Sequence, residues 1–409
     1  MIAAAFGAEV QDTFGQHAVS KMPSGGVIKR LGKAKMTGHA AMCRDILAKA
    51  GLSANIAMTA KKFLAHNHHV ICPADYVSAL AATGKLQNLT GDQPLQPTLL
   101  RFWELFAAYR PGHPALANGL EACAFSVPIL LFGDEGRALK KQAAMVLGWE
   151  PMIGYGCLSH CDDDPSPLHG HMLNRTGSTY KTRVLYTIRY KRSYGKKSQV
   201  LLELIQSWAT DHAAAMAGID VMYEGAKISL KLVPMGLKSD WAAMAKLGQL
   251  GRSFYHDSTP FGKGICHLCL GNTEACHEWT TETWKTTMGD SYFPPWSVEP
   301  HLVQWLCADY ENDWEKAAFF RLDLFHICHK GTMAELAGSA LVTILDTNLF
   351  ATAGSFETKM EGIFMLLKKF AKDEHLSLHM SALTRTLLRF PDANSFPAGP
   401  LQLLSMEVV

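Results

Sequence analysis

Apolar residues recur at helical spacing in several parts of the chain. In Thr98–Tyr109 they fall on one face of a helix, and Arg110-Pro111-Gly112 ends the pattern. Residues 1–120 as a whole are expected to be mainly helical and irregular. Further segments with helical spacing are 198–216, 240–250, 331–345, 362–370 and 377–388.

Runs rich in β-forming residues lie near the middle of the chain. Lys227–Val233 alternates apolar and polar positions, and Val184–Tyr190 does so in part. Ala124–Phe132 is a continuous apolar run, which is typical of a buried strand, although Pro128 favours a strand edge or start because it has no N–H. Segments 143–155 and 318–324 are further predicted strands.

This order of elements predicts an α/β fold, with strands and a helix, then an insertion, then mostly helices. At about 150 residues per domain, the length suggests two or three domains. We divide the chain into a helical N-terminal region, the first part of the core, a Cys/His-rich insertion, and the last core elements with C-terminal helices. These segments are 1–120, 121–250, 251–317 and 318–409.

Composition adds little to this picture. Hydrophobic residues make up 48% and charged residues 19% of the chain, which is typical of a globular protein. A net charge of +2 does not indicate a partner. Without a signal-like start or an apolar stretch near the length of a membrane helix, the expectation is an intracellular protein whose ten cysteines are free or metal-bound.

Two acids stand at predicted element ends. Asp134 follows the apolar run that ends at Phe132, and Asp240 opens the predicted helix 240–250, where Ser239 is an alternative N-cap. Folding can bring such positions together, and carboxylate oxygens are the ligands that Mg²⁺ prefers. The alternative is that both acids are turn or cap residues.

Three ordered strings resemble segments of CACTA-type and related DDE/D transposases. Phe132–Gly136 resembles the strand end that carries their first acid. Val233–Leu247, followed by Gly264–Cys269, resembles the strand, acid, helix and Cys-x-x-Cys segment. Leu322–Gly331, with Leu336–Leu341, resembles their later Asp-x-x-His segment.

The resemblance implies an RNase H-like mixed sheet with flanking helices and metal-dependent cleavage and transfer of DNA strands. Asp134 would be the first acid, Asp240 the second, and Asp323 or Glu335 the third, with Asp323 preferred. Two Mg²⁺ or Mn²⁺ ions would activate the nucleophile and stabilise the leaving oxygen. DNA is the expected partner, a homo-oligomer is left open, and the implied location is the nucleus.

Cys266 and Cys269 are spaced as one half of a zinc site. Nearby candidates for the other half are Cys276 and His277, or His326 and His329, and the resemblance favours His326. A second cluster could close on a metal, and the alternative is that it is a solvated polar loop. Its residues are Cys157, His160, Cys161, His169 and His171.

A basic stretch extends from residue 175 to 197 without an acidic residue. Tyr180, Tyr186, Tyr190 and Tyr194 are interleaved with its cations, so it combines phosphate-neutralising charge with rings that stack on bases. The alternative is a solvated hairpin surface. Its cations are Arg175, Lys181, Arg183, Arg189, Lys191, Arg192, Lys196 and Lys197.

Two other functions fit the same residues. A domesticated transposase would keep the fold and the DNA contacts without catalysis. A zinc-stabilised interaction protein would need neither the DNA contacts nor catalysis. An acid triad around one pocket distinguishes the enzyme from the first alternative, and a basic face distinguishes DNA binding from the second.

Overall fold

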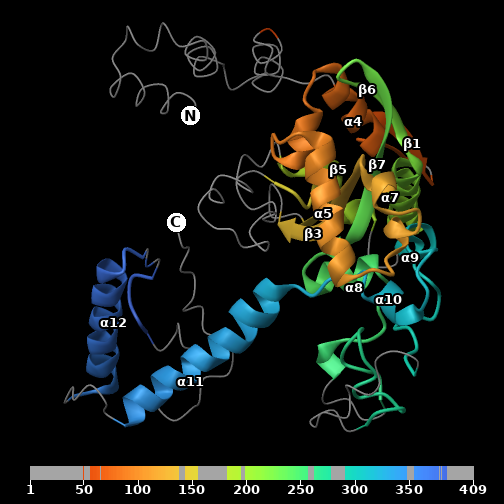
Figure 1. Ribbon diagram of the computed structural model, residues 1–409. Coiled ribbons are helices and arrows are strands. Elements are labelled where there is room, and N and C mark those ends of the chain that lie inside the picture. The colour runs from red at the N-terminus through yellow and green to blue at the C-terminus, as the bar shows by residue number, and fades with distance from the viewer. Residues whose placement is uncertain are drawn as a thin grey trace, which may run out of the picture. The chain divides into compact units, whose positions relative to one another are not determined.

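The computed structural model describes most of the chain between residues 56 and 384 (Figure 1). The described residues are 49, 56–64, 66–137, 143–154, 182–194, 199–256, 262–277, 291–347, 354–376, 378 and 380–384. They form two compact units. The first comprises residues 1–131, 136–235 and 301–310, and the second comprises 132–135, 236–300 and 311–409.

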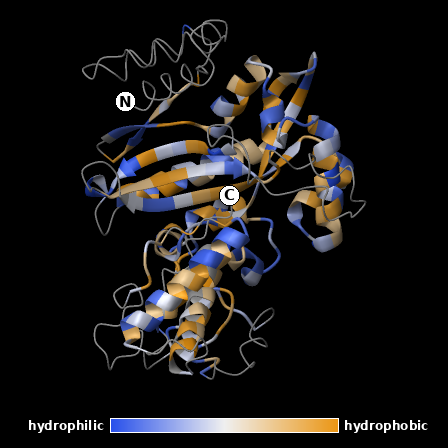
Figure 2. Ribbon diagram, turned by 90° about the vertical axis from the view of Figure 1, so that its left-hand side faces the viewer, coloured by the Kyte–Doolittle hydropathy of each residue, from blue (hydrophilic) through white to orange (hydrophobic). Residues whose placement is uncertain are grey.

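A mixed five-stranded sheet with flanking helices forms the α/β framework, with strand order β5-β4-β3-β7-β6. Its strands are β3 (Ser126–Arg137), β4 (Ala143–Pro151), β5 (Val184–Tyr190), β6 (Ile219–Tyr223) and β7 (Ala226–Lys238). Figure 2 shows hydrophobic and hydrophilic positions interspersed along the strands, as expected where the two sheet faces differ in burial.

The strand directions follow from the backbone contacts. β4 pairs antiparallel with β5, and β6 pairs antiparallel with β7. The amide of Met152 donates to Pro128 O at 2.9 Å, so β4 ends where β3 begins and the two run antiparallel. Lys231 N donates to Phe125 O, and further along both strands Ser239 Oγ donates to Gly133 O. β3 and β7 are therefore parallel neighbours, and Pro128 stands near the start of a central strand.

Helices flank the sheet in the first unit (Figure 1). Buried Trp149 of β4 and Trp208 both pack edge-on against the His212 ring. The helices are α4 (Pro73–Ala82), α5 (Leu95–Tyr109), α7 (Gln199–Ala217) and α9 (His301–Leu306), with short 3-10 helices η1 (Leu86–Thr90), η2 (Pro114–Leu116), η3 (Leu120–Cys123) and η5 (Lys191–Ser193).

A hairpin of β1 (Thr59–Phe63) and β2 (His66–Val70) lies beside β5. The chain just after it continues this contact, since Ile71 N donates to Tyr186 O at 2.9 Å. The hairpin therefore protects an edge of the main sheet. Residues 1–120 were predicted to be mainly helical and irregular, and the sequence did not predict this hairpin, because its Asn and His residues are poor β-formers that tertiary contacts hold extended.

The second unit contains the remaining helices and a loop-rich segment. These helices are α8 (Trp241–Leu247), η6 (Phe254–His256), α10 (Asp313–Ala317), a π-helix η8 (Phe325–Thr332), α11 (Met333–Asp346) and α12 (Phe356–Asp373). Leu345 of α11 packs with Met360 and Ile363 of α12 in a small core of their own.

Two predictions of secondary structure differ from the structure. The strand expected over 318–324 is reduced to one parallel bridge between Phe320 and Leu237. The helix expected over 377–388 is absent from the described residues 380–384, where Leu383 packs into the core of α11 and α12 from a non-helical segment. In the described part of the chain, no helix is long and apolar enough to cross a membrane.

Candidate functional site

Three acids predicted from the sequence occupy equivalent places in the second unit. Asp134 lies near the end of β3, and Asp240 directly follows the end of β7 with only Ser239 between. Asp323 follows Phe320, which forms the parallel bridge to Leu237 of β7. Because these three segments run parallel, their C-terminal ends lie at one edge of the sheet.

Backbone contacts tie these three segments to one another. Ser239 Oγ donates to Gly133 O at 2.5 Å, which joins the residue before Asp240 to the residue before Asp134. Leu237 N donates to Phe319 O, and Arg321 N donates to Leu237 O, both at 2.8 Å. A Cβ atom on Gly236 would meet Phe319 O at 2.8 Å, so only glycine permits this approach.

Asp240 performs the local role that its position predicted. Its Oδ1 accepts a hydrogen bond from Ala243 N at 2.8 Å and so caps α8. One carboxylate oxygen is thus used by the helix, and the side chain also lines a cavity. Asp134 is exposed and does not line that cavity.

Asp323 makes two contacts with the same residue. Its Oδ2 bonds His326 Nδ1 at short range, and its Oδ1 accepts from His326 N at 3.3 Å. The carboxylate thus orients the imidazole. Glu335, the other candidate for the third acid, lies on α11, and its side chain is outside the described part of the structure, as is that of His329.

A cavity of about 790 Å³ opens between α8, the Cys266 turn and η8. Most of its wall is apolar, and Asp240, Asp323 and His326 supply charged or titratable groups. Trp241, the residue after Asp240, donates from Nε1 to Ser253 Oγ at 3.0 Å. The lining residues are Asp240, Trp241, Ala242, Met244, Phe254, Ile265, Cys266, His267, Leu322, Asp323, His326, Ile327 and Thr332.

Cys266 and Cys269 lie in a tight turn closed by Gly264 N donating to Asn272 O at 2.7 Å. A hydrogen bond from Cys269 lowers the pKa of the Cys266 thiol, and the Leu268 and Cys269 amides and Arg252 lower it further. The same contact raises the pKa of Cys269. One sulfur is thereby poised as a thiolate, the form in which cysteine binds metals.

Sequence reasoning missed Arg252, which supports this turn from within the protein. Its guanidinium donates to Cys269 O at 2.9 Å and stacks 5.2 Å from the Tyr292 ring centroid and 4.6 Å from that of Phe293. The signal was a lone arginine between glycine and serine ahead of a cysteine-rich stretch, which by itself indicates a loop.

The metal sites expected from the sequence are not assembled in the described part of the chain. Nowhere in it do three or more His, Cys, Asp or Glu side chains form a group that could hold an ion. Cys276 instead packs with Leu270 and Tyr292 in an apolar cluster, and His277 joins no metal-binding group. The cluster Cys157, His160, Cys161, His169 and His171 lies outside the described residues.

The basic stretch is not a uniform surface. Arg189 is only 5% exposed, and its Nε donates to Ser193 Oγ at 3.0 Å. Arg183 pairs with Glu150 at 2.5 Å. Arg192 is exposed and lies over the Tyr190 ring at 5.6 Å. Lys191 is half-buried, and Tyr186 and Tyr194 are buried. Arg175, Tyr180, Lys181, Lys196 and Lys197 lie outside the described residues.

Among the described cations of this stretch, the exposed one is Arg192, which lies just after β5 and over the Tyr190 ring. Buried Arg189 is not available to a phosphate. Charge patterning alone did not separate these residues, because burial depends on what packs over the strand.

No known family identifies this chain. Comparison with protein-family models, with curated proteins and with solved structures finds no match. The geometry above is therefore the basis for any statement on function.

Proposed function

We propose that this chain is a DNA-processing protein with an RNase H-like core that cleaves and transfers DNA strands with Mg²⁺ or Mn²⁺, as DDE/D transposases do. The observation that carries the proposal is the shared position of three acids. Asp134 lies near the C-terminal end of β3, Asp240 follows β7, and Asp323 follows the segment bridged in parallel to β7. All three acids belong to the second compact unit. Nuclear localisation would follow from this activity.

The order of the strands supports the same proposal. Three antiparallel strands, β3, β4 and β5, precede α7. After the edge strand β6, which is an addition to such a core, the chain places β7 parallel to β3 and the Phe320 segment parallel to β7. This is the order expected of an RNase H-like core. The insertion with Cys266 and Cys269 lies between the last two parallel segments, as the resemblance to transposases implies.

The donor set is of the kind that divalent cations require. The three acids offer hard carboxylate oxygens, which suit Mg²⁺ and Mn²⁺. When bound, such ions activate water or a 3′-hydroxyl and stabilise the leaving oxygen. In the described residues the three carboxylates are not gathered into one group, and one oxygen of Asp240 is held by the α8 cap.

A second candidate function is DNA binding without catalysis. The Asp323–His326 pair favours it, because an Asp323 that orients a histidine is not used as the third catalytic acid. Both Asp323 oxygens contact His326. A carboxylate that holds Nδ1 of a histidine presents Nε2 to a metal, the arrangement common around zinc. We propose a structural zinc site formed by His326, Cys266 and Cys269, although in the described residues these three side chains are not gathered into one ion-binding group. His326 and Cys266 line the same cavity, and Asp323 would then orient a ligand.

The decisive experiment is a nicking assay on supercoiled DNA with Mg²⁺ or Mn²⁺. It compares the parent chain with Asp240→Asn, which keeps an N-cap acceptor while removing the carboxylate charge. Asp220→Asn is the matched control, since Asp220 is an exposed acid on β6 paired with Lys227. Cleavage that Asp240→Asn abolishes and Asp220→Asn preserves would support the enzyme.

Two other results would redirect the proposal. DNA binding without cleavage would favour the inactive binding protein. Cleavage that survives both Asp134→Asn and Asp240→Asn would remove the acids from the mechanism. Zinc is measured separately by elemental analysis, where the parent is expected to carry one equivalent that Cys266→Ser loses. A chain that carries zinc but does not bind DNA would support the remaining alternative, a zinc-stabilised interaction protein.

A further inference from the structure

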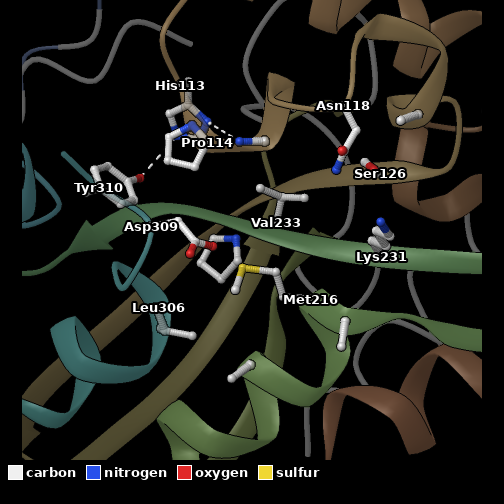
Figure 3. A pocket seen from close by; sticks show the side chains of 15 residues that line it. His113, Pro114, Asn118, Ser126, Met216, Lys231, Val233, Leu306, Asp309 and Tyr310 are labelled. Atoms are coloured by element: carbon white, nitrogen blue, oxygen red, sulfur yellow. Dashed lines mark hydrogen bonds between the residues drawn. The ribbon is translucent and has the colours of Figure 1, made fainter.

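A second cavity, of about 310 Å³, lies wholly within the first unit, whereas Asp134, Asp240 and Asp323 belong to the second. Its walls come from η2 and η3, the start of β3, the end of α7, β7 and the segment after α9 (Figure 3). Met216, Val233 and Leu306 contribute apolar side chains to its lining (Figure 3). Its size is at the lower end of the range for small-molecule sites.

One side of the cavity carries hydrogen-bond donors. Figure 3 shows Asn118, Ser126 and Lys231 on this side, with the Asn118 amide and the Lys231 ammonium pointing toward the space between them. Ser126 is only 4% exposed. Among the residues that the structure describes, neither its hydroxyl nor the Lys231 ammonium has a hydrogen-bond or ion-pair partner.

Groups of this kind are costly to leave without partners. An ammonium and a hydroxyl on a cavity wall lose part of their hydration, and an acceptor placed between them would restore those hydrogen bonds. Lys231 is a strand residue, so its Cα position is fixed by β7. A carboxylate of a ligand would accept from Lys231, Asn118 and Ser126 together.

The opposite side of the cavity carries a hydrogen-bond acceptor, the Asp309 carboxylate. Asp309 lines the cavity there, and its carboxylate likewise has no hydrogen-bond or ion-pair partner among the described residues. Beside it, His113 Nδ1 accepts from Ala115 N at 3.2 Å. The proton of that ring is therefore on Nε2, which donates to the Tyr310 hydroxyl at 3.1 Å and holds Tyr310 in place (Figure 3).

The cavity thus holds a cation and an anion that do not pair with each other, and its lining includes apolar side chains. We infer that it binds a small zwitterion of the amino-acid type. The ligand carboxylate lies at Lys231, Asn118 and Ser126, its ammonium lies at Asp309, and its apolar side chain packs on Met216, Val233 and Leu306. This site does not depend on the DNA-processing proposal.

Calorimetry and thermal unfolding of the full chain test this with three matched probes. L-leucine carries both charges, 4-methylpentanoate lacks the ammonium, and 3-methylbutylamine lacks the carboxylate. We expect leucine at a large excess to raise the melting temperature by about 2 °C or more, since a ligand that binds only the folded state stabilises it. Each single-charge probe is expected to bind at least about tenfold more weakly.

Variants then assign each charge. Lys231→Met is expected to abolish binding of both leucine and 4-methylpentanoate. Asp309→Asn is expected to weaken the binding of leucine about tenfold while leaving the affinity for 4-methylpentanoate unchanged. Lys227→Met is the control, because Lys227 is an exposed lysine of the same strand that pairs with Asp220 at 2.8 Å.

Asn118→Ala keeps the test valid if Lys231→Met fails to fold, because Asn118 is an exposed residue whose removal leaves the core intact. This substitution is expected to weaken the binding of leucine several-fold. The inference is overturned if leucine at about 10 mM gives neither heat nor a thermal shift. It is equally overturned if folded Lys231→Met, or Asn118→Ala, binds leucine as the parent does.

Discussion

The hydroxyl of Ser239 donates a 2.5 Å hydrogen bond to the carbonyl of Gly133. This contact joins two residues that are far apart in the sequence, and each of them directly precedes an acid. It therefore fixes the backbone at Asp134 and Asp240 relative to each other, whatever the two carboxylates bind. The expectation that these acids follow neighbouring core elements is consistent with the parallel pairing of β3 and β7.

The two roles of Asp240 can be separated by comparing two substitutions. Asp240→Ala removes the acceptor for Ala243 N and is expected to cost about 1 kcal/mol of unfolding free energy. Asp240→Asn keeps a cap acceptor and is expected to cost only a few tenths of a kcal/mol, while any DNA cleavage is lost in both. Urea unfolding and the nicking assay measure these effects. Equal destabilisation by both variants would show that the cap contributes little.

A partly buried polar network contacts the β1–β2 hairpin, and its removal tests how firmly the hairpin is held. Lys61 Nζ contacts both Asp211 oxygens at 2.6 Å, and Tyr186 donates to Asp211 at 2.9 Å. Asp211→Ala leaves the largely buried Lys61 ammonium without its carboxylate. We expect a loss of about 2–3 kcal/mol of unfolding free energy in urea.

The control for this network is Asp220→Ala, which removes a carboxylate from an exposed pair with Lys227. It is expected to change the unfolding free energy by less than about 1 kcal/mol. If the two substitutions have the same effect, the Lys61–Asp211 contact does not anchor the hairpin.

Burial separates two neighbouring arginines that look alike in the sequence. Exposed Arg192 stacks on Tyr190 and is available to DNA, whereas Arg189 is buried and bonds Ser193. If the chain binds DNA, Arg192→Gln is expected to weaken binding and reduce the slope of log K against log salt by about 0.9 per lost phosphate contact. Fluorescence anisotropy across a salt series measures this.

Arg189→Gln serves as the matched comparison for that titration. It is expected to lower thermal stability while leaving the salt slope of the folded protein unchanged, because the buried guanidinium does not reach solvent. A reduced salt slope for Arg189→Gln, with no change for Arg192→Gln, would contradict the prediction. The phosphate contact would then belong to Arg189 and not to Arg192.

Buried His212 makes stability depend on pH. Burial lowers its pKa to about 4, and its Nδ1 bonds Trp208 O at 2.9 Å. The unfolded chain binds a proton near pH 6.5, so this group favours folding above that pH and the advantage is lost as the pH falls from about 6.5 to 4. The loss at pH 4 is on the order of 3 kcal/mol.

Denaturant unfolding at pH 7 and pH 4.5 measures this effect. His212→Gln, which has no ring to protonate, is expected to be less stable at pH 7 but to show a smaller loss on acidification. An unchanged pH dependence in that variant would place the responsible group elsewhere.

Local patterns in the sequence were sufficient for several elements. The helical spacing of Thr98–Tyr109 predicted α5, and the alternation in Lys227–Val233 predicted β7. The helix predicted from residue 240 is α8, and its N-cap is Asp240, one of the two candidates that the sequence left open. These features depend on interactions within a few residues, where side-chain period and capping chemistry decide the backbone conformation.

Only the tertiary structure decided which elements meet. The parallel pairing of β3 with β7, the burial of Arg189 and the contact of Asp323 with His326 all depend on how the surrounding chain packs. The same is true of the cavity that collects Ser126, Lys231 and Asp309 from three distant segments. A residue's type sets what it can bond, but its exposure and its partners are determined by residues distant in sequence, because burial is a property of the packed fold.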